Sequence, residues 1–354
     1  MGDNAQSHIH TFAAQRRLLV ERLHIFLAPL HSDLYADVLQ ALETEGKLLS
    51  VKDEIDTATR SSSIAGSWPL LTFLVAQTIA PDGDLAYQSS VAVATECFIC
   101  ALDLLDDVED EDQTPIVQAL GIARTLNVST TLLMLAQQAL LSLTEHQVPA
   151  VHILHLLNAM QTCALVATKG QHQDLLAERR SAAAFTQEDC IEIARGKAGA
   201  LMRMAFLLGA ICAGADDVTR EQFAALGELL GIAHQLDNDA HDLYYLLHNY
   251  SSMSGATQAG TDPMSQSTHR KKTDLARQKK TLPVVLAAQQ EKADLQEKAM
   301  QADEQEQGHL RALQEGILTT WSFSLLYRER ARDILQEIER HQLVSSLLHL
   351  LLGL

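Results

Sequence analysis

Acidic residues near position 105 repeat at the spacing of a helix face. The segment ECFICALDLLDDVEDED, residues 96–112, contains four aspartates separated by three, four and seven positions, so one side of a helix carries all of them. They are Asp103, Asp106, Asp107 and Asp110. The residues before them are apolar, which predicts that this face points inward. A buried carboxylate row with no Lys or Arg nearby in the sequence requires a cation, and oxygen ligands of this kind favour Mg²⁺ beside substrate phosphates.

The alternative is a solvated acidic end of a helix, which needs no ligand. That interpretation applies to Glu109, Glu111 and Asp112, which lie among and after the aspartates of the predicted face. For a single motif of this kind the solvated alternative stays open, and only a matching second site argues against it.

A second polar set follows about 130 residues later, in the segment LGIAHQLDNDAHDLY at residues 230–244. Spacings of three, four and seven again place its members on one helix face. They are Gln235, Asn238, Asp239 and Asp242. Two such helices facing each other across a cavity would hold metal ions with a substrate phosphate between them.

Positive charge should then reach the phosphate from other segments. Lys197, in ARGKAGALMRMA, and Lys279, in DLARQKKTLP, are the candidates. Either lysine, taken alone, could equally be a surface residue. The two carboxylate sets favour the functional interpretation.

The composition restricts the classes of function. With 354 residues and a net charge of −18, the chain lacks the dense Lys and Arg that a nucleic-acid-binding protein needs. Its five cysteines show no framework spacing, which predicts reduced thiols in a cytoplasmic protein without a secretory signal. The apolar C-terminal run LVSSLLHLLLGL, residues 343–354, could pack on the body or make peripheral membrane contact.

The elements that must position these residues are helices. The apolar residues repeat with helical periodicity from end to end, and alternating strand patterns are absent, so we expect an all-α fold. The expected helices span residues 11–30, 33–46, 63–79, 86–108, 115–143, 150–177, 187–213, 219–248, 281–302 and 308–352. Residues 250–272 are rich in Ser, Gly and Thr and predict a mobile loop that could close over the site. A single domain over residues 1–354, with antiparallel helices around a central cavity, is the simplest architecture.

At this point the chain resembles the trans-isoprenyl diphosphate synthase family, also called polyprenyl synthetases. The family motif DDxxD matches DDVED at residues 106–110, and FQxxDDxxD is similar to HQLDNDAHD at 234–242, with Asn238 in place of one Asp. GQxxDL resembles GQHQDL at 170–175, the lysine-bearing helix resembles the segment at Gly196 and Lys197, and KxTLP matches KKTLP at 279–283. These motifs keep their order over about residues 60–290. The resemblance implies the isoprenoid synthase fold, C-terminal helices over 281–354 and a homodimer.

The resemblance also implies roles for individual residues. The catalytic set would be Asp106, Asp107, Lys197 and Asp239. The Mg²⁺ ligands would be Asp106, Asp107, Asp110, Asn238, Asp239 and Asp242. Lys197, Gln235 and Lys279 would bind the diphosphate of an allylic prenyl substrate. Ala101, Leu102 and Gln171 would line the cavity, with the small Ala101 leaving room for longer chains.

Departures from the family pattern concern the second substrate. The family motif GGKRxRP corresponds here to SIAGSWP at residues 63–69, which has no cation, and no Arg pair follows the first aspartate motif. Ile99 replaces an expected His. An apolar surface cannot hold the diphosphate of isopentenyl diphosphate, because its charge would be desolvated without a partner.

Three functions remain open at this level. The first is ionisation of an allylic prenyl diphosphate without isopentenyl diphosphate, as in terpene synthases on this scaffold or bacterial isoprenyltransferases that modify a pheromone peptide. The second is ordinary chain elongation, with ligands for the second substrate supplied by His24, Lys47 or Arg60. The third is an inactive partner subunit of a heteromeric synthase.

Overall fold

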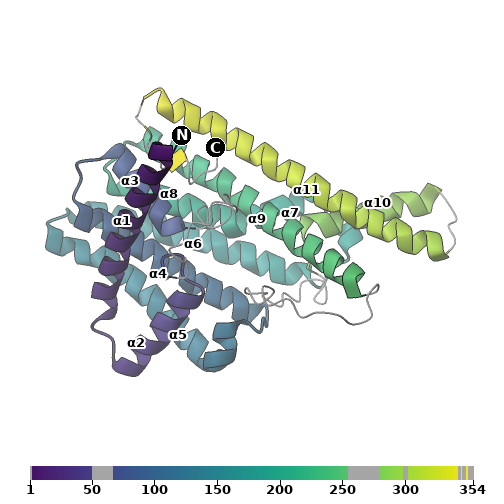
Figure 1. Ribbon diagram of the computed structural model, residues 1–354, viewed down its shortest axis with the longest axis horizontal. Helices are drawn as coiled ribbons and strands as arrows, with labels where there is room; N and C mark the ends of the chain where they lie inside the picture. The colour runs from purple at the N-terminus through teal and green to yellow at the C-terminus, as the bar shows by residue number, and fades with distance from the viewer. Residues whose placement is uncertain are drawn as a thin grey trace. The chain divides into compact units, whose positions relative to one another are not determined.

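The computed structural model describes residues 2–49, 67–253, 279–297, 302–341, 344 and 348–349. Within these residues every regular element is a helix, and Figure 1 draws coiled ribbons without arrows. The predicted all-α class is therefore confirmed. Arg60, residues 63–66, the part of the predicted loop beyond residue 253 and most of the C-terminal run 343–354 lie outside the described residues.

The helices lie close to the predicted ranges. They are α1 (Gly2–Leu27), α2 (Ser32–Thr44), α3 (Trp68–Ile79), α4 (Leu85–Glu109), α5 (Pro115–Leu141), α6 (Ala150–Ala177), α7 (Gln187–Ala194), α8 (Ala200–Cys212), α9 (Asp217–Met253), α10 (Leu282–Glu297) and α11 (Ala302–Glu339). Short 3₁₀ turns follow α5 at Ser142–His146 (η1) and α6 at Ala182–Ala184 (η2).

Several predicted boundaries were wrong. Helix α1 begins at Gly2 and not at residue 11, α11 ends at Glu339 and not at residue 352, and two further differences concern the functional helices. The helix predicted over 187–213 is α7 and α8 joined by a π-helical turn, η3 (Arg195–Gly199). The helix expected to end at residue 248 continues to Met253, and so takes the first residues of the predicted loop. Periodicity does not reveal the π-helical turn, because such a turn adds one residue without ending the helix. It does not reveal the longer α9 either, because a polar stretch can continue a helix.

Local signals explain how the functional helices begin. The carboxylate of Asp84 accepts hydrogen bonds from the backbone N–H groups of Ala86 and Tyr87 and caps α4. Pro69 and Pro115 stand in the first turns of α3 and α5, where a missing N–H costs nothing. Thr186 and Asp189 form a capping box that starts α7.

The described chain divides into two compact units. Unit 1 contains residues 1–165, 201–228 and 331–354, and unit 2 contains residues 166–200 and 229–330. This division does not test the predicted single domain over residues 1–354, which stays a prediction. In unit 1, helix α4 packs against α5, α3 and α1, and α2 packs against α5. The middle of α4, from Gln88 to Ala101, is buried throughout.

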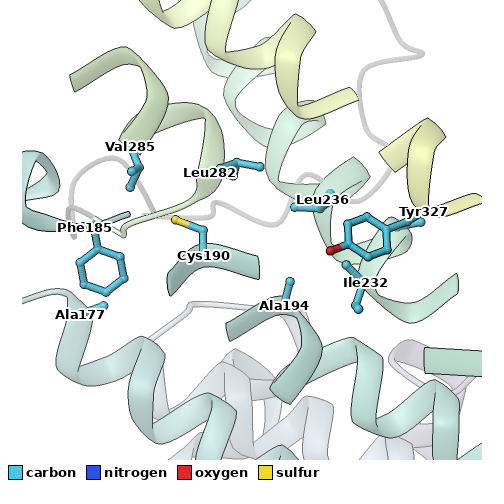
Figure 2. Close-up of a cluster of buried hydrophobic side chains, with 10 residues drawn as sticks. Ala177, Phe185, Cys190, Ala194, Ile232, Leu236, Leu282, Val285 and Tyr327 are labelled. Atoms are coloured by element: carbon cyan, nitrogen blue, oxygen red, sulfur yellow. The ribbon is translucent and has the colours of Figure 1, made fainter. Parts of the chain in front are cut away.

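The core of unit 2 lies around Cys190 of α7 (Figure 2). Figure 2 shows Ile232, Leu236 and Tyr327 grouped on one side of this residue and Ala177 and Phe185 on the other. The Cys190 thiol donates to the Lys280 carbonyl at 3.3 Å. Helices α6, α7, α9, α10 and α11 therefore meet in one apolar cluster, which holds the polar face of α9 in place.

Close backbone contacts fix the π-helical turn within unit 2. A Cβ on Gly170 of α6 would lie 2.5 Å from the carbonyl carbon of Gly196, and one on Gly231 of α9 would lie 2.3 Å from the carbonyl oxygen of Ala198. Only glycine permits these approaches. The turn that carries Lys197 is thus held between two helices by backbone contact.

Candidate active site

The first carboxylate row occupies the C-terminal half of α4, in unit 1. Asp107 and Asp110 are almost fully buried, at 3% and 2% exposure, while Asp103 and Asp106 are half-buried. The Thr114 hydroxyl donates to Asp107 Oδ2 at 3.0 Å. Asp107 and Asp110 are thus covered as the sequence predicted, whereas Asp103 and Asp106 are covered only in part.

Asp112 corrects one interpretation, since we expected it to be solvated. It is 5% exposed, because Glu111 adopts a positive φ of 53° and turns the chain back. The Asp112 backbone N–H then donates to the Asp107 carbonyl at 2.8 Å. Glu109 and Glu111 are exposed as predicted.

A lysine distant in sequence contacts the first row. Lys47, in the connection after α2, places its ammonium 2.6 Å from Asp103 Oδ2 and 3.1 Å from the Glu45 carbonyl. From the sequence, Lys47 was only one of three candidate ligands for a second substrate. Its contact with Asp103 shows that the row does have a cationic neighbour, which the absence of nearby Lys and Arg in the sequence had concealed.

Glu96 anchors the segment that carries Lys47. Its carboxylate is fully buried on α4, and Oε1 accepts the Leu48 backbone N–H at 2.9 Å. Burial raises the pKa of Glu96 to about 7, while the contact with Leu48 and the charge of Lys47 oppose the shift. Glu96 is a neighbour of the first row that sequence spacing missed, since it lies seven residues before Asp103 within an apolar run.

The second row lies on α9, in unit 2. Gln235 Nε2 donates to Asp239 Oδ1 at 2.9 Å, and Asn238 Nδ2 donates to His234 Nε2 at 3.4 Å. Asp239 and Asp242 are half-buried. On the apolar side of the same helix Leu236, Ala240 and Leu243 are buried. The predicted alternation between a polar face and an apolar core face is therefore present.

Lys197 forms an ion pair with Asp174 of α6. Its Nζ lies 2.8 Å from Asp174 Oδ2, and the two side chains are 15% and 16% exposed. The π-helical turn positions Lys197, and such turns are frequent at functional sites. Asp174 lies within the GQHQDL motif, but the motif does not show that Lys197 is its partner.

Unit 2 also contains a buried thiol, Cys190 of α7. Burial is the largest cause of the raised pKa of Cys190, and the charges of Asp239, Asp189 and Asp174 raise it further. The second row, the Lys197–Asp174 pair and this thiol therefore all belong to unit 2.

The two lysines that precede α10 differ in burial. Lys279, the predicted diphosphate ligand, is half-buried, whereas Lys280 is 5% exposed. Desolvation lowers the pKa of Lys280, and the charge of Glu178 on α6 opposes this. The sequence motif could not tell which of the two neighbouring lysines would be enclosed.

The three predicted cavity residues lie on α4 and α6. Ala101 is fully buried, and its carbonyl accepts from the Ser129 hydroxyl of α5 at 2.9 Å. Leu102 is half-buried. Both amide atoms of the Gln171 side chain are buried and have no hydrogen-bond partner among the described residues. A buried amide in that condition favours a ligand, since it costs free energy until a partner arrives.

The donor set suits a hard divalent cation. Among the described side chains, no group of three His, Cys, Asp or Glu residues converges as a preformed metal site. Mg²⁺ needs only one or two carboxylates when substrate phosphate completes its shell. Asp107 and Asp110 are almost fully buried carboxylates on α4, and carboxylate oxygens are ligands that suit Mg²⁺. Because the two rows lie in different units, their facing each other stays a prediction.

Comparisons with known proteins identify the family. The sequence profile of the family Polyprenyl synthetase matches residues 67–251, more than half of the chain. Tryptophan prenyltransferase ComQ of Bacillus spizizenii is 34% identical over 157 residues, which is 44% of this chain and 50% of that protein. The (2E,6E)-farnesyl diphosphate synthase of Mycobacterium tuberculosis H37Rv is 30% identical over 219 residues, 61% of this chain and 54% of that one. The chain thus spans about half the length of the curated relatives it matches.

Solved structures share the fold. A polyprenyl synthetase from Streptomyces coelicolor A3(2) gives a TM-score of 0.68 at 21% identity, covering 96% of this chain and 97% of that chain. A decaprenyl diphosphate synthase from Rhodobacter capsulatus gives a TM-score of 0.69 at 18% identity, with coverage of 98% and 96%. The protein belongs to the polyprenyl synthetase family and has its all-α isoprenoid synthase fold. The resemblance seen in the motifs is confirmed.

Proposed function

We propose that the protein is a Mg²⁺-dependent prenyltransferase that ionises an allylic prenyl diphosphate and passes the prenyl cation to an acceptor other than isopentenyl diphosphate. Cyclisation or proton loss, as in a terpene synthase, is the fate of the same cation when no acceptor is present. The tryptophan prenyltransferase among the relatives favours transfer. We include a cytoplasmic location in this proposal.

The observation that carries the proposal is the Lys197–Asp174 ion pair, in the unit that also contains the second row on α9. Asp239 belongs to the second row, and Lys197 is the cation 2.8 Å from Asp174. A diphosphate needs both a metal-binding carboxylate and a direct cationic contact. Unit 2 supplies both beside an apolar core, where water is excluded and electrostatic contacts are strong.

The residues divide the work of ionisation. Asp106, Asp107 and Asp110 of α4 and Asn238, Asp239 and Asp242 of α9 would hold Mg²⁺, which when bound neutralises the diphosphate charge. Lys197 exchanges Asp174 for a diphosphate oxygen, and Lys279 and Gln235 contact the same group. The bond between C1 of the prenyl chain and the diphosphate oxygen breaks, and its electron pair leaves with the diphosphate. The acceptor then donates an electron pair to C1 and loses a proton.

Product analysis tests this function directly. Purified protein is incubated with Mg²⁺ and farnesyl or geranylgeranyl diphosphate, with and without isopentenyl diphosphate and with a tryptophan-containing peptide. Diphosphate release without isopentenyl diphosphate, with a prenylated peptide, hydrocarbon or alcohol as product, is expected. A product that forms only with isopentenyl diphosphate contradicts the proposal. Folded protein that releases no diphosphate in any arm indicates the inactive partner subunit.

One structural observation favours chain elongation as a second candidate. Lys47 lies 2.6 Å from Asp103, three residues before the first motif, and could meet a second diphosphate there. In that case Lys47→Ala would raise the KM for isopentenyl diphosphate far more than the KM for the allylic substrate. His24, the other described alternative, is exposed on α1.

A homodimer formed through α5 and α6 is part of the proposal. The stretches Pro115–His146 and Ala150–Ala177 are long and apolar enough to cross a membrane by length and composition, with only 39% and 33% of their apolar windows buried. Between Arg124 and Lys169 the only charged residue besides histidines is Glu145. Leu154 and Leu165 lie on α6 within this uncharged stretch and are 62% and 72% exposed. A second copy of the same surface would cover it, since it carries almost no charge to repel.

A further inference from the structure

Five aromatic and imidazole rings form a cluster between α9 and α11 in unit 2. The rings are those of His241, Tyr244, Tyr245 and His248 on α9 and Trp321 on α11. Trp321 lies 5.4 Å from His241 and 5.8 Å from Tyr244, between ring centroids. Tyr244 lies 4.6 Å from His248 and 5.8 Å from Tyr245. We call this set the ring cluster.

The ring cluster is accessible although it contacts the core. Tyr244 and Tyr245 are 37% and 53% exposed, and both histidines are exposed. Trp321 is half-buried and packs against the apolar cluster beneath α9. Its indole N–H is buried and has no acceptor among the described residues. Large rings that stay in solvent mark a binding surface more often than a folding requirement.

Helical spacing places the ring cluster beside the second carboxylate row. Tyr245 follows Asp242 by three residues and Asn238 by seven, so it lies on the same side of α9, one turn closer to its C-terminal end. His241 directly precedes Asp242, and its Nδ1–H donates to the Asp237 carbonyl at 2.7 Å. A molecule bound to the rings would therefore lie next to the proposed diphosphate site.

The charge around the rings selects a cationic ligand. Helix α9 has three aspartates and no Lys or Arg between Asp237 and His248. Helix α11 also has no Lys or Arg between Glu315 and Tyr327. Arg328, at the edge of this region, pairs with Asp237 at 2.6 Å. Aromatic faces next to carboxylates attract ammonium and guanidinium groups as well as other rings. The whole chain, with a net charge of −18, adds to that attraction.

We infer that the ring cluster binds the acceptor, and that this acceptor is a peptide with an aromatic side chain flanked by basic residues. The inference rests on the proposed transfer to an acceptor other than isopentenyl diphosphate. The exposed tyrosines pack against the peptide's ring, and the neighbouring carboxylates attract its basic side chains. A peptide carbonyl can also supply an acceptor for the Trp321 indole once the covering rings shift.

The binding test uses a defined probe, a short synthetic peptide with one tryptophan between lysines. Its affinity is measured by calorimetry on the full chain with Mg²⁺ and farnesyl thiodiphosphate. Tyr244→Ala and Tyr245→Ala should each weaken binding about tenfold, and Tyr245→Phe, which keeps the ring, should restore it. Leu310→Ala is the matched control, since Leu310 is 42% exposed in the same unit and lies on α11, outside the ring cluster. Replacing the tryptophan by alanine, or the lysines by glutamates, should also weaken binding.

Several outcomes overturn the inference. The first is no binding of the probe by the wild-type protein, and the second is equal weakening by Leu310→Ala. The third is a set of ring variants that bind the probe normally while losing self-association or binding to phosphatidylcholine vesicles. Diphosphate release by the wild-type protein is measured on the same preparation. If the wild-type protein releases diphosphate but the ring variants bind the probe as well as it does, only the acceptor site is refuted. If probe binding depends on the rings but no diphosphate is released, only the proposed function is refuted. In a transfer assay, the ring variants should raise the KM for the peptide more than they lower kcat.

Discussion

Lys197 of the π-helical turn and Asp174 of α6 form an ion pair 2.8 Å long that is largely shielded from solvent. The pair has a direct consequence for diphosphate binding. A lysine that is already charged and positioned needs only to exchange one anionic partner for another, so little ordering remains to be done when substrate arrives. Asp174 thereby acts as a positioning residue for Lys197.

Lys197→Met should weaken the binding of inorganic diphosphate in the presence of Mg²⁺. A charge-assisted hydrogen bond contributes about 1.5–3 kcal/mol, so we expect the Kd to rise about 10- to 100-fold. Calorimetric titration measures it. Lys169→Met, an exposed lysine on α6, is the control. Equal affinities for the wild-type protein and Lys197→Met would remove Lys197 from the site.

Asp239→Asn should nearly abolish diphosphate release from farnesyl diphosphate while the fold persists. Asparagine still accepts the Gln235 hydrogen bond at its Oδ1, so only the charge is lost. We expect a loss of about 100-fold or more in kcat, the size found when one electrostatic contact to a leaving group is removed. Asp333→Asn, at an exposed carboxylate of α11, serves for comparison. Near-normal turnover in Asp239→Asn would mean that the second row does not bind metal.

Glu96 should make stability fall as pH rises. Its pKa is raised from 4.5 to about 7, so the folded state holds a proton that the unfolded state releases between these values. Stability from the neutral acid is full below about pH 4.5 and is lost as pH approaches 7, by about 3 kcal/mol for a shift of about 2.5 pH units. Glu96→Gln should lack this loss. Urea unfolding at about pH 5 and about pH 8 compares the two proteins, and parallel pH profiles would refute the assignment.

Gly231→Ala should destabilise unit 2 and displace Lys197. The added Cβ would lie 2.3 Å from the Ala198 carbonyl oxygen, which belongs to η3. We expect a cost of about 1–3 kcal/mol, although alanine is intrinsically the better helix former. Thermal unfolding and diphosphate affinity are both measured, with exposed Thr319→Ala as the control. An unchanged or higher Tm would show that the two helices have room to separate.

Leu154→Glu should convert a dimer into monomers. Leu154 is 62% exposed on α6, and a carboxylate there would face its own copy across a two-fold interface. Val218→Glu, 69% exposed at the start of α9, tests for a general effect of added charge. Sedimentation velocity distinguishes the species. A wild-type monomer, or a Leu154→Glu dimer, would exclude this surface.

The sequence predicted most of the helices because amphipathic periodicity is a local property. It also located both carboxylate rows, since each lies on one helix and its spacing is visible in the chain. It could not place Lys47 beside Asp103, 56 residues away, because a connecting segment has no periodicity to read. The same applies to Lys197 and Asp174, whose contact depends on how α6 and η3 pack. Nor did the KKTLP motif show that Lys280 would be the enclosed lysine.

The π-helical turn makes the site unusually sensitive to changes in chain length. Removing one residue from Arg195–Gly199 would let the segment close as ordinary α-helix, with little loss of hydrogen bonding. The residues of α7 and α8 would keep their faces, because the π-helical turn accommodates one extra residue and only that widening would disappear. Loss of a single codon in this stretch would therefore leave a folded helical protein without the wide turn that positions Lys197, a defect that no substitution at one position would reproduce.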